Sequence, residues 1–220
     1  MFTKQKPGRV NADLSDTGRG ALEALVHGWG VVPVHCVVPV EEDADGEVTT
    51  WCCSCKRGED CPTPGGHPLF ENWEQKIIET ADEIGELWTE YPVLNVGVRT
   101  GVRHGVALQI EGVWEDPLSV ISLREQIGFV PRTPKAISCS DAETYFFLYP
   151  HGYSCQEMPS ISLGPDVTLR QDHDYVILPP SVAENFMVED EEWVWEVGLD
   201  EPLAELPEAL VGLGGLPHEV

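Results

Sequence analysis

The segments NVGVRTG (95–101) and GVALQIEG (105–112) decide the expected fold, because each is a short run that contains β-branched residues and is bounded by glycine or asparagine. Runs of this length and composition are typical of β-strands, and the glycine-containing link between them is typical of a turn. We therefore expect two neighbouring strands here. Further apolar runs predict strands at 31–40, 136–140, 144–150, 161–164, 166–170, 174–180 and 193–198.

Helices are expected between these strands. Asp16 or Thr17 is placed to cap a helix through Leu25, and Gly28 or Gly30 is placed to end it. A capping box, in which a Thr and a Glu three residues later satisfy free backbone N–H groups, marks a second helix. This box lies at 80–83 and opens a helix that ends near residue 91. Two further helices are predicted at 118–127 and 202–213. Strands interspersed with helices predict a mixed α/β or α+β domain.

The chain of 220 residues suits one large domain. We expect this domain to span 16–213, after a flexible lead at 1–15 and before a short tail at 214–220. A polar excursion at 41–68, which carries most of the cysteines, forms an insertion in it. The chain has no apolar run of about 18 residues and no apolar stretch at its start. We therefore expect a soluble, cytoplasmic protein without a membrane span or signal peptide.

Acidic residues dominate the charge of the chain, with 38 Asp and Glu against 13 Lys and Arg and a net charge of −25. Nucleic-acid-binding proteins normally gather cations to displace counterions from phosphates. The balance therefore predicts weak or no non-specific nucleic-acid binding, and an acidic surface that serves either solubility or a basic protein partner. A small basic groove stays open as an alternative, since four cations lie near the N-terminus: Lys4, Lys6, Arg9 and Arg19.

A cluster of cysteines lies in the polar excursion. The pattern Cys53-x-Cys55-x5-Cys61-x5-His67 offers three thiolates and one imidazole, which is a tetrahedral ligand set typical of zinc. In an intracellular chain such cysteines favour metal binding over disulfides. Four protein ligands leave no open position, so the predicted zinc is structural. Cys52 is an alternative to Cys53 as ligand, and a loop of free thiols is the alternative to any metal.

The order of several short segments resembles one protein family. These segments are ALVHGWGVVPV (24–34), CSCKRGEDCPTPGGHP (53–68), FENW (70–73), ELWTEYPVLNVGVRTG (86–101), GVALQIEG (105–112) and HDYVILPPSV (173–182). Together they resemble the N-terminal primase-polymerase (prim-pol) domain of bifunctional replication proteins, within the archaeo-eukaryotic primase superfamily. The resemblance covers nearly the whole chain. It implies an RRM-like mixed β-sheet core with a second small α/β module, and a cleft for template and incoming nucleotide.

Nucleotidyl transfer in this family needs carboxylates that hold two divalent metal ions. The family supplies two acids from one strand as D-x-D or D-x-E, and alternation along the strand puts both on the same face. The matching strand here reads Leu108-Gln109-Ile110-Glu111. Gln109 takes the place of the first acid, and a neutral amide is a poor Mg²⁺ ligand beside a carboxylate. Glu111 keeps the second acid.

Other positions of the family's site are also substituted. The resemblance puts Thr144 where the family has a histidine that contacts the triphosphate, with Ser140 in the preceding turn. It puts Arg170 on the family's arginine, which makes Ser140 and Arg170 the nucleotide-binding candidates. Thr168 falls on the third acid, and Asp166 replaces it only after a two-residue shift of register.

The charges expected near the nucleotide site also argue against nucleotide binding. Asp141 and Glu143 are expected to add negative charge where the phosphates would lie, and the lysine that the family has beside its histidine-proline pair is Gly66 here. The run 172–174, Asp-His-Asp, has the composition of a metal or acid–base cluster. Because it directly precedes a predicted strand, we expect it to be a polar turn.

These substitutions predict a catalytically degenerate primase-polymerase-like protein that acts as a binding or regulatory module, with a structural zinc and a protein partner. One alternative is an active DNA primase or polymerase that uses Glu111, Asp166 and Asp172, with Mg²⁺ or Mn²⁺ as cofactor. Another is an acidic protein that mimics DNA toward a basic partner. The first alternative requires carboxylates that converge in the cleft, whereas the second depends on surface charge alone.

Overall fold

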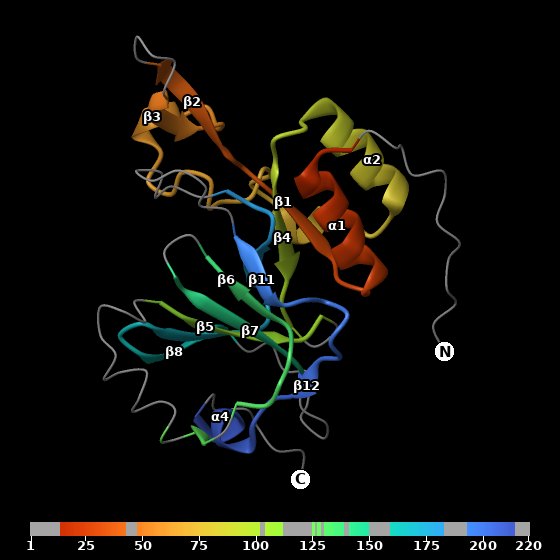
Figure 1. The fold of residues 1–220 in the computed structure, drawn as a ribbon, viewed down its shortest axis with the longest axis vertical. Helices are drawn as coiled ribbons and strands as arrows, with labels where there is room; N and C mark the ends of the chain where they lie inside the picture. The colour runs from red at the N-terminus through yellow and green to blue at the C-terminus, as the bar shows by residue number, and fades with distance from the viewer. Residues whose placement is uncertain are drawn as a thin grey trace.

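The computed structural model describes residues 14–42, 48–101, 104–111, 125, 127–128, 130–138, 141–149, 159–182 and 193–213. Two sheets, a separate two-stranded ribbon and a few short helices make up this part of the chain (Figure 1). This arrangement confirms the predicted mixed α+β class. None of the described helices is long and apolar enough to cross a membrane. The predicted lead and tail fall almost wholly outside the described residues, so the domain boundaries stay predictions.

The smaller sheet has three antiparallel strands, with β4 (Asn95–Arg99) between β1 (Val31–Val34) and β10 (Tyr175–Leu178). Two helices, α1 (Asp16–Val26) and α2 (Ala81–Glu90), lie beside it (Figure 1). Their buried side chains belong to the same apolar core as the inward-facing valines of the sheet. This unit matches the small α/β module that the family resemblance implies.

The helix starts follow local capping. The Ser15 side chain, rather than the expected Asp16 or Thr17, caps α1 by accepting the Gly18 N–H at 3.2 Å. Asp16 is already the first helical residue, so the cap falls one position earlier than predicted. At α2 the prediction is confirmed: Thr80 accepts the Glu83 N–H at 3.3 Å and its hydroxyl donates to the Glu83 carboxylate at 2.5 Å.

The larger sheet has seven strands in the order β11-β6-β7-β5-β9-β8, with β12 beside β7. All neighbours are antiparallel except β12, which runs parallel to β7. Helix α4 (Glu208–Leu213) follows β12. The strands are β5 (Val106–Ile110), β6 (Lys135–Ile137), β7 (Glu143–Leu148), β8 (Ile161–Gly164), β9 (Val167–Arg170), β11 (Val194–Val197) and β12 (Ala204–Glu205).

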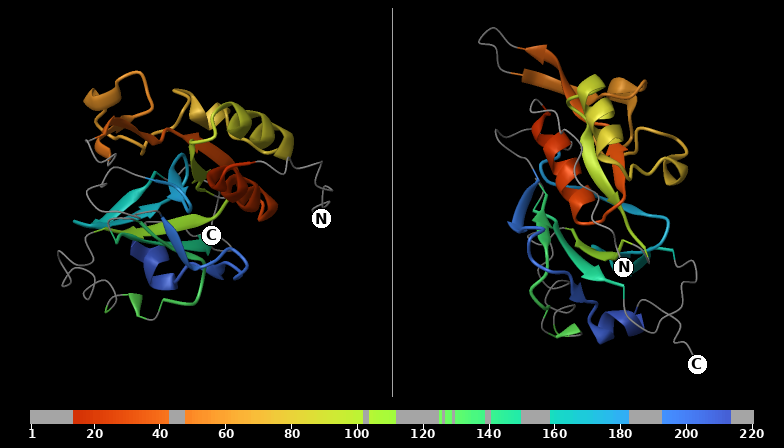
Figure 2. Two further views of the ribbon diagram at one scale, coloured as in Figure 1. Left: turned by 45° about the horizontal axis from the view of Figure 1, so that its top comes forward. Right: turned by 90° about the vertical axis from the view of Figure 1, so that its right-hand side faces the viewer.

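Side chains alternate across this sheet between two cores. Ala107 and Phe146 face the core shared with α1, α2 and the smaller sheet. Leu108 and Phe147 face a second core, which Leu210 of α4 covers. Because β5 is buried on both faces, it reads as a nearly continuous apolar run. The larger sheet thus lies between the α1–α2 module and α4, as both views of Figure 2 show.

Strands β4 and β5 form as the segments 95–101 and 105–112 predict, but they are not paired neighbours. Strand β4 has β1 and β10 on its two edges, and β5 has β7 and β9. The predicted pairing is therefore wrong, since neither strand has a free edge for the other. Only a bridge between Gly101 and Gly105, with Gly101 N–H donating to Gly105 C=O at 2.7 Å, joins them where the chain passes between the sheets.

The run 31–40 was expected to be one strand and is two. Strand β1 ends at Val34, and β2 (Val37–Glu42) then pairs with β3 (Val48–Cys53) in the separate ribbon. The chain changes direction at His35 and Cys36. The Asn95 side chain donates to the His35 carbonyl, and the His35 N–H donates to the His67 carbonyl. His67 ends the loop 53–67, which carries the predicted metal ligands and which we call the metal-binding loop. Two short 3₁₀ turns, η1 (Gly58–Asp60) and η2 (Trp73–Gln75), follow the ribbon.

The C-terminal segment is less helical than expected. Only 208–213 of the predicted helix at 202–213 is helical, because 204–205 instead form β12 along β7. Hydrogen bonding to a sheet edge competes with the helix for the same backbone groups. The helix predicted at 118–127 lies largely outside the described residues.

Asn95 ties the smaller sheet to the segments around it. It is almost fully buried, and its Nδ2 donates to the carbonyls of His35, Gly65 and Val182 at 3.2, 3.0 and 2.6 Å. Its Oδ1 accepts the Val182 N–H at 2.9 Å. One side chain therefore satisfies backbone groups at the end of β1, in the metal-binding loop and after β10.

We predict that Asn95→Ala lowers the free energy of unfolding by about 2–4 kcal/mol, because it leaves several buried backbone groups without partners. Urea unfolding followed by fluorescence measures the change. The control is Asn72→Ala, at an exposed position whose side chain makes no capping hydrogen bond, and it should change stability by less than about 0.5 kcal/mol. Equal stability of the two variants would contradict the role of Asn95.

Candidate functional site

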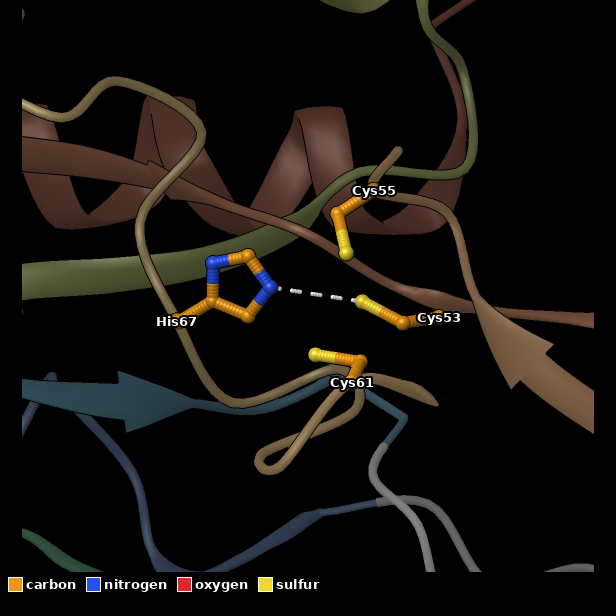
Figure 3. A group of neighbouring side chains, drawn as sticks. All are labelled: Cys53, Cys55, Cys61 and His67. Carbon is orange, nitrogen blue, oxygen red and sulfur yellow. Dashed lines mark hydrogen bonds between the residues drawn. The ribbon is translucent and has the colours of Figure 1, made fainter. Parts of the chain in front are cut away.

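The predicted cysteine–histidine set is assembled in space (Figure 3). The ligand atoms of Cys53, Cys55, Cys61 and His67 all lie within 4.8 Å of one another, and Cys53 Sγ is 3.4 Å from His67 Nε2. Two sulfurs bound to one tetrahedral zinc, each at about 2.3 Å, lie about 3.8 Å apart. The four side chains therefore need only small movements to surround one metal ion.

Local structure brings these four residues together. Cys53 ends β3, and Cys55 and Cys61 flank the turn that contains η1. Gly65 has a φ of +68°, which lets the chain turn back toward His67. The His67 carbonyl accepts the His35 N–H at 2.9 Å, so the loop is fixed to the end of β1.

The thiols differ in acidity. Burial raises the pKa of the Cys53 thiol to about 12. At Cys55 burial raises the pKa, but hydrogen bonds to the sulfur, first from the Arg57 N–H and then from Cys53, His67 and Cys61, together outweigh burial and lower the pKa to about 6. Cys55 is therefore the more acidic of the two thiols, and Cys53 would lose its proton on binding a metal ion.

Cys52 is not part of the cluster. It neighbours Cys53 on β3, where alternation directs consecutive side chains to opposite faces, and its Sγ donates to the Cys53 carbonyl at 3.5 Å. The spacing predicted Cys53 as a ligand with Cys52 as its alternative, and the geometry selects Cys53. The resulting three sulfurs and one nitrogen fit a metal ion such as zinc.

Sequence reasoning missed the residues around this cluster. The His35 ring lies 4.6 Å from the His67 ring, and its Nδ1 is 2.9 Å from Ser54 Oγ. Burial, followed by the nearby His67, lowers the pKa of His35. His35 lies in an apolar run rather than in a ligand pattern, so no sequence motif singles it out.

The second candidate site is a row of three side chains in the larger sheet, which we call the polar row: Gln109, Thr144 and Thr168. Gln109 on β5 is directly opposite Thr144 on β7 and directly opposite Thr168 on β9. All three lie on the sheet face that carries Ala107, toward the α1–α2 module. Thr144 is fully buried, and its Oγ1 has no hydrogen-bond partner among the described residues.

Glu111 and Asp166 lie on one side of the polar row, each two residues along its strand from Gln109 or Thr168. The Glu111 N–H donates to the Asp166 carbonyl at 2.7 Å, and Asp166 sits in the turn before β9. The strand register pairs Thr168, not Asp166, with Gln109. Within the described part of the chain, neither carboxylate forms an ion pair with a basic side chain.

Arg170 ends β9, two residues along the strand from Thr168. Its Nε donates to Gln109 Oε1 at 3.0 Å, and its Nη1 donates to Asp174 Oδ2 at 3.0 Å. Ser160 also donates to Asp174 Oδ2, at 2.5 Å. Asp174 belongs to the Asp-His-Asp run, which forms the expected turn before β10 and whose His173 is 3.1 Å from a Glu74 oxygen.

The expected charge of Glu143 near the polar row is wrong. Glu143 alternates to the opposite face of β7 from Thr144, where Lys135 Nζ donates to it at 2.8 Å and the Tyr145 hydroxyl donates to it at 2.6 Å. Lys135 also pairs with Glu196 at 2.6 Å. Although burial alone lowers it, these carboxylates raise the pKa of Lys135, and the charge of Glu143 is locally neutralised.

The remaining predicted residues are not brought to this row. Asp141 lies in the exposed turn before β7, with a φ of +60°. Asp172 lies beside Gly101, at the link between β4 and β5. Ser140, predicted to contact a nucleotide, falls outside the described residues.

We predict that Cys61→Ser removes most of the bound metal, because it deletes one of four ligands, and that it lowers the melting temperature. Cys52→Ser should keep the metal, since Cys52 lies outside the cluster. Elemental analysis of the purified proteins gives the identity and amount of metal, and we expect close to one zinc per wild-type chain. Equal metal content in Cys61→Ser and wild type would show that these side chains do not hold it.

No curated protein sequence matches the chain. The model of one family, described as bifunctional DNA primase/polymerase, N-terminal, matches residues 21–209. That match covers most of the chain, including the metal-binding loop, the polar row and both sheets. The chain therefore belongs to the family of N-terminal domains of bifunctional DNA primase/polymerases.

Proposed function

We propose that this protein is a catalytically degenerate member of its family, which acts as a binding module and contains a structural zinc ion. The main support for the loss of catalysis is the composition of the polar row. There a neutral amide and two hydroxyl groups stand where the family resemblance expects two metal-binding acids and a histidine. Directly opposed side chains in a sheet lie about 5 Å apart, so all three substitutions fall on one small area.

The carboxylates that remain support loss of activity. Two-metal catalysis requires several carboxylates around the same pair of ions. Glu111 and Asp166 are neighbours, but among the described residues only the Cys₃His cluster gathers three or more groups that could hold a metal ion. Mg²⁺ binds through oxygen ligands in a strict octahedron, and the amide and hydroxyls of the polar row are weak substitutes for acids.

Arg170 gives a further argument against a metal at the polar row. It donates to Gln109 Oε1, which is the oxygen that a metal ion at this position would require. The charge of Arg170 is balanced by Asp174, which lies outside the row.

The donor set of the Cys₃His cluster supports zinc. Three thiolates and one imidazole suit zinc better than the hard cations Mg²⁺ and Ca²⁺. Four protein ligands leave no position for a substrate or water, which argues for a structural role. The ion would join the end of β3 to the loop that leads back to β1, in a segment that has little apolar core of its own.

The charge of the chain supports a protein partner over nucleic acid. With a net charge of −25, the long-range field of the protein repels phosphates and attracts basic proteins. Arg170, which lies beside the polar row, is paired with Asp174, so its charge is already balanced within the protein. This balance favours a binding role toward a basic protein, and it also accommodates the narrower possibility of DNA mimicry.

We predict no primer synthesis or extension by the wild-type chain with either Mg²⁺ or Mn²⁺. Loss of one preorganised charge-stabilising group typically costs about 10²- to 10³-fold in rate, and here three positions are changed. A labelled-nucleotide incorporation assay measures the activity. Gln109→Asp alone should not restore it, because Thr144 and Thr168 remain.

The matched control in that assay is Glu111→Ala, which exposes a contaminating polymerase. Incorporation that persists in Glu111→Ala comes from such a contaminant. Incorporation that disappears in this variant would refute the proposal and establish an active enzyme that uses Glu111.

We also expect the protein to bind generic single- or double-stranded DNA only weakly at physiological salt. With 13 Lys and Arg against 38 Asp and Glu, binding should release few counterions, so any residual binding should show a shallow dependence on salt. Fluorescence anisotropy with labelled oligonucleotides at several salt concentrations measures both. A sub-micromolar Kd with a steep salt slope would reveal a basic groove and contradict this expectation.

A further inference from the structure

The Cys55 thiol differs from the other two thiols of the Cys₃His cluster in its exposure. Cys53 and Cys61 are buried, at 1% and 7% exposed, whereas Cys55 is only partly buried. A small oxidant that approaches from solvent therefore reaches Cys55 before the two buried sulfurs. A thiol that coordinates a metal ion is held as the thiolate, which is the nucleophilic form of cysteine.

The surroundings of Cys55 are basic in an otherwise acidic protein. Lys56 and Arg57 directly follow Cys55, and both are exposed. They are two of 13 cations in a chain of net charge −25, and neither forms an ion pair within the described residues. The Arg57 N–H also donates to Cys55 Sγ at 3.4 Å. Reactive cysteines lie in partly exposed, electropositive surroundings of this kind, whereas buried structural cysteines are inert.

A second thiolate lies within reach of Cys55. The ligand atoms of the cluster all lie within 4.8 Å of one another, and a disulfide joins its sulfurs at about 2.05 Å (Figure 3). Cys53 is paired with Val37 in the ribbon, whereas Cys61 follows η1 in a loop. The loop backbone can follow its sulfur more easily than a paired strand can, so Cys61 is the better partner. A reactive thiolate beside a second, resolving cysteine is the arrangement found in redox sensors.

Cys52 provides an internal comparison. It is also partly exposed, but its Sγ donates to the Cys53 carbonyl at 3.5 Å and lies outside the cluster. A thiol that donates a hydrogen bond keeps its proton and is a poor nucleophile. Exposure alone therefore does not select Cys55, and the difference between the two lies in the metal cluster and the adjacent cations.

We propose that Cys55 is a site of oxidation by hydroperoxides, which Cys61 resolves as a Cys55–Cys61 disulfide with release of the zinc ion. The Cys55 thiolate attacks one oxygen of hydrogen peroxide, so that an S–O bond forms, the O–O bond breaks and hydroxide leaves. The Cys61 thiolate then attacks the Cys55 sulfur, so that the S–S bond forms, the S–O bond breaks and a second hydroxide leaves. The two sulfurs lose two electrons, which the peroxide gains, and solvent protons convert both hydroxides to water.

Loss of the metal would release the β2–β3 ribbon. After oxidation, Cys53 and His67 are the two cluster ligands that remain, and a closed zinc site needs four. The ribbon pairs with no third strand in the described chain, and neither apolar core includes a described residue of 37–53. A two-stranded hairpin without such support is marginally stable in water. Oxidation would therefore loosen the ribbon while both larger sheets stay folded.

The test uses the zinc-loaded full chain, hydrogen peroxide and a chromogenic zinc chelator. We expect peroxide to release the bound zinc, and mass spectrometry of the alkylated product to find the Cys55–Cys61 disulfide. The amide resonances of 48–53 should lose their dispersion in the oxidised protein. Dithiothreitol with added zinc should restore both the metal content and these resonances.

Two variants test the role of the local charge without removing a ligand. Lys56→Gln combined with Arg57→Gln should slow zinc release about threefold or more, because the cations no longer stabilise the hydroxide that leaves. The matched control is Arg19→Gln combined with Arg132→Gln, which removes the same charge from side chains that are 61% and 72% exposed elsewhere. This control and Cys52→Ser should both release zinc at the wild-type rate.

Three results would overturn the proposal: zinc that stays bound while peroxide oxidises the protein, a first oxidation product at a cysteine other than Cys55, or equal release by wild type and the Lys56 and Arg57 variant. The inference rests on the zinc ion proposed above. Purified protein that holds no zinc would refute that ion and this inference together, whereas zinc retained through oxidation would refute this inference alone. Since the readouts do not involve the polar row, primer extension by the wild-type chain would not change this result.

Discussion

Strand β5 is hydrogen-bonded along both edges, to β7 and to β9, and its two faces enter different apolar cores. This constraint fixes its register, because a slip of one residue would move Leu108 and Ile110 out of the core beneath α4. It also fixes the polar row, since Gln109 must then lie between Thr144 and Thr168. The positions of Gln109, Thr144 and Thr168 relative to one another follow from the pairing of this one strand.

Much of the fold could be predicted from local patterns, and the failures share a cause. The strands around 95–101 and 105–112 and the helix after Thr80 were predictable because short-range hydrophobic patterns and capping hydrogen bonds determine them. The partners of those strands were not, because long-range pairing selects among edges that look alike in sequence. The division of 31–40 into β1 and β2 likewise depends on distant contacts to Asn95 and the metal-binding loop.

In the candidate sites, too, local features were predictable from the sequence and long-range contacts were not. The spacing of Cys53, Cys55, Cys61 and His67 predicted the cluster, since metal ligands close together in sequence need only a local turn. The hydrogen bond from Arg170 to Gln109 joins separate strands and leaves no sequence pattern. The prediction for Glu143 was wrong because side chains alternate between the two faces of a strand. The face of Glu143 therefore depends on which residue begins β7, and the sequence does not determine that start to within one residue.

The burial of Thr144 limits which side chains this position of the sheet can accept. A histidine at this position would need room for an imidazole, yet Thr144 is fully enclosed between neighbouring strands and the core. Inserting a larger side chain into a packed interior typically costs about 1–3 kcal/mol. A Thr144→His substitution would therefore be opposed by stability. The packing between neighbouring strands and the core restricts this position to small side chains, whatever the chemistry of the surrounding groups.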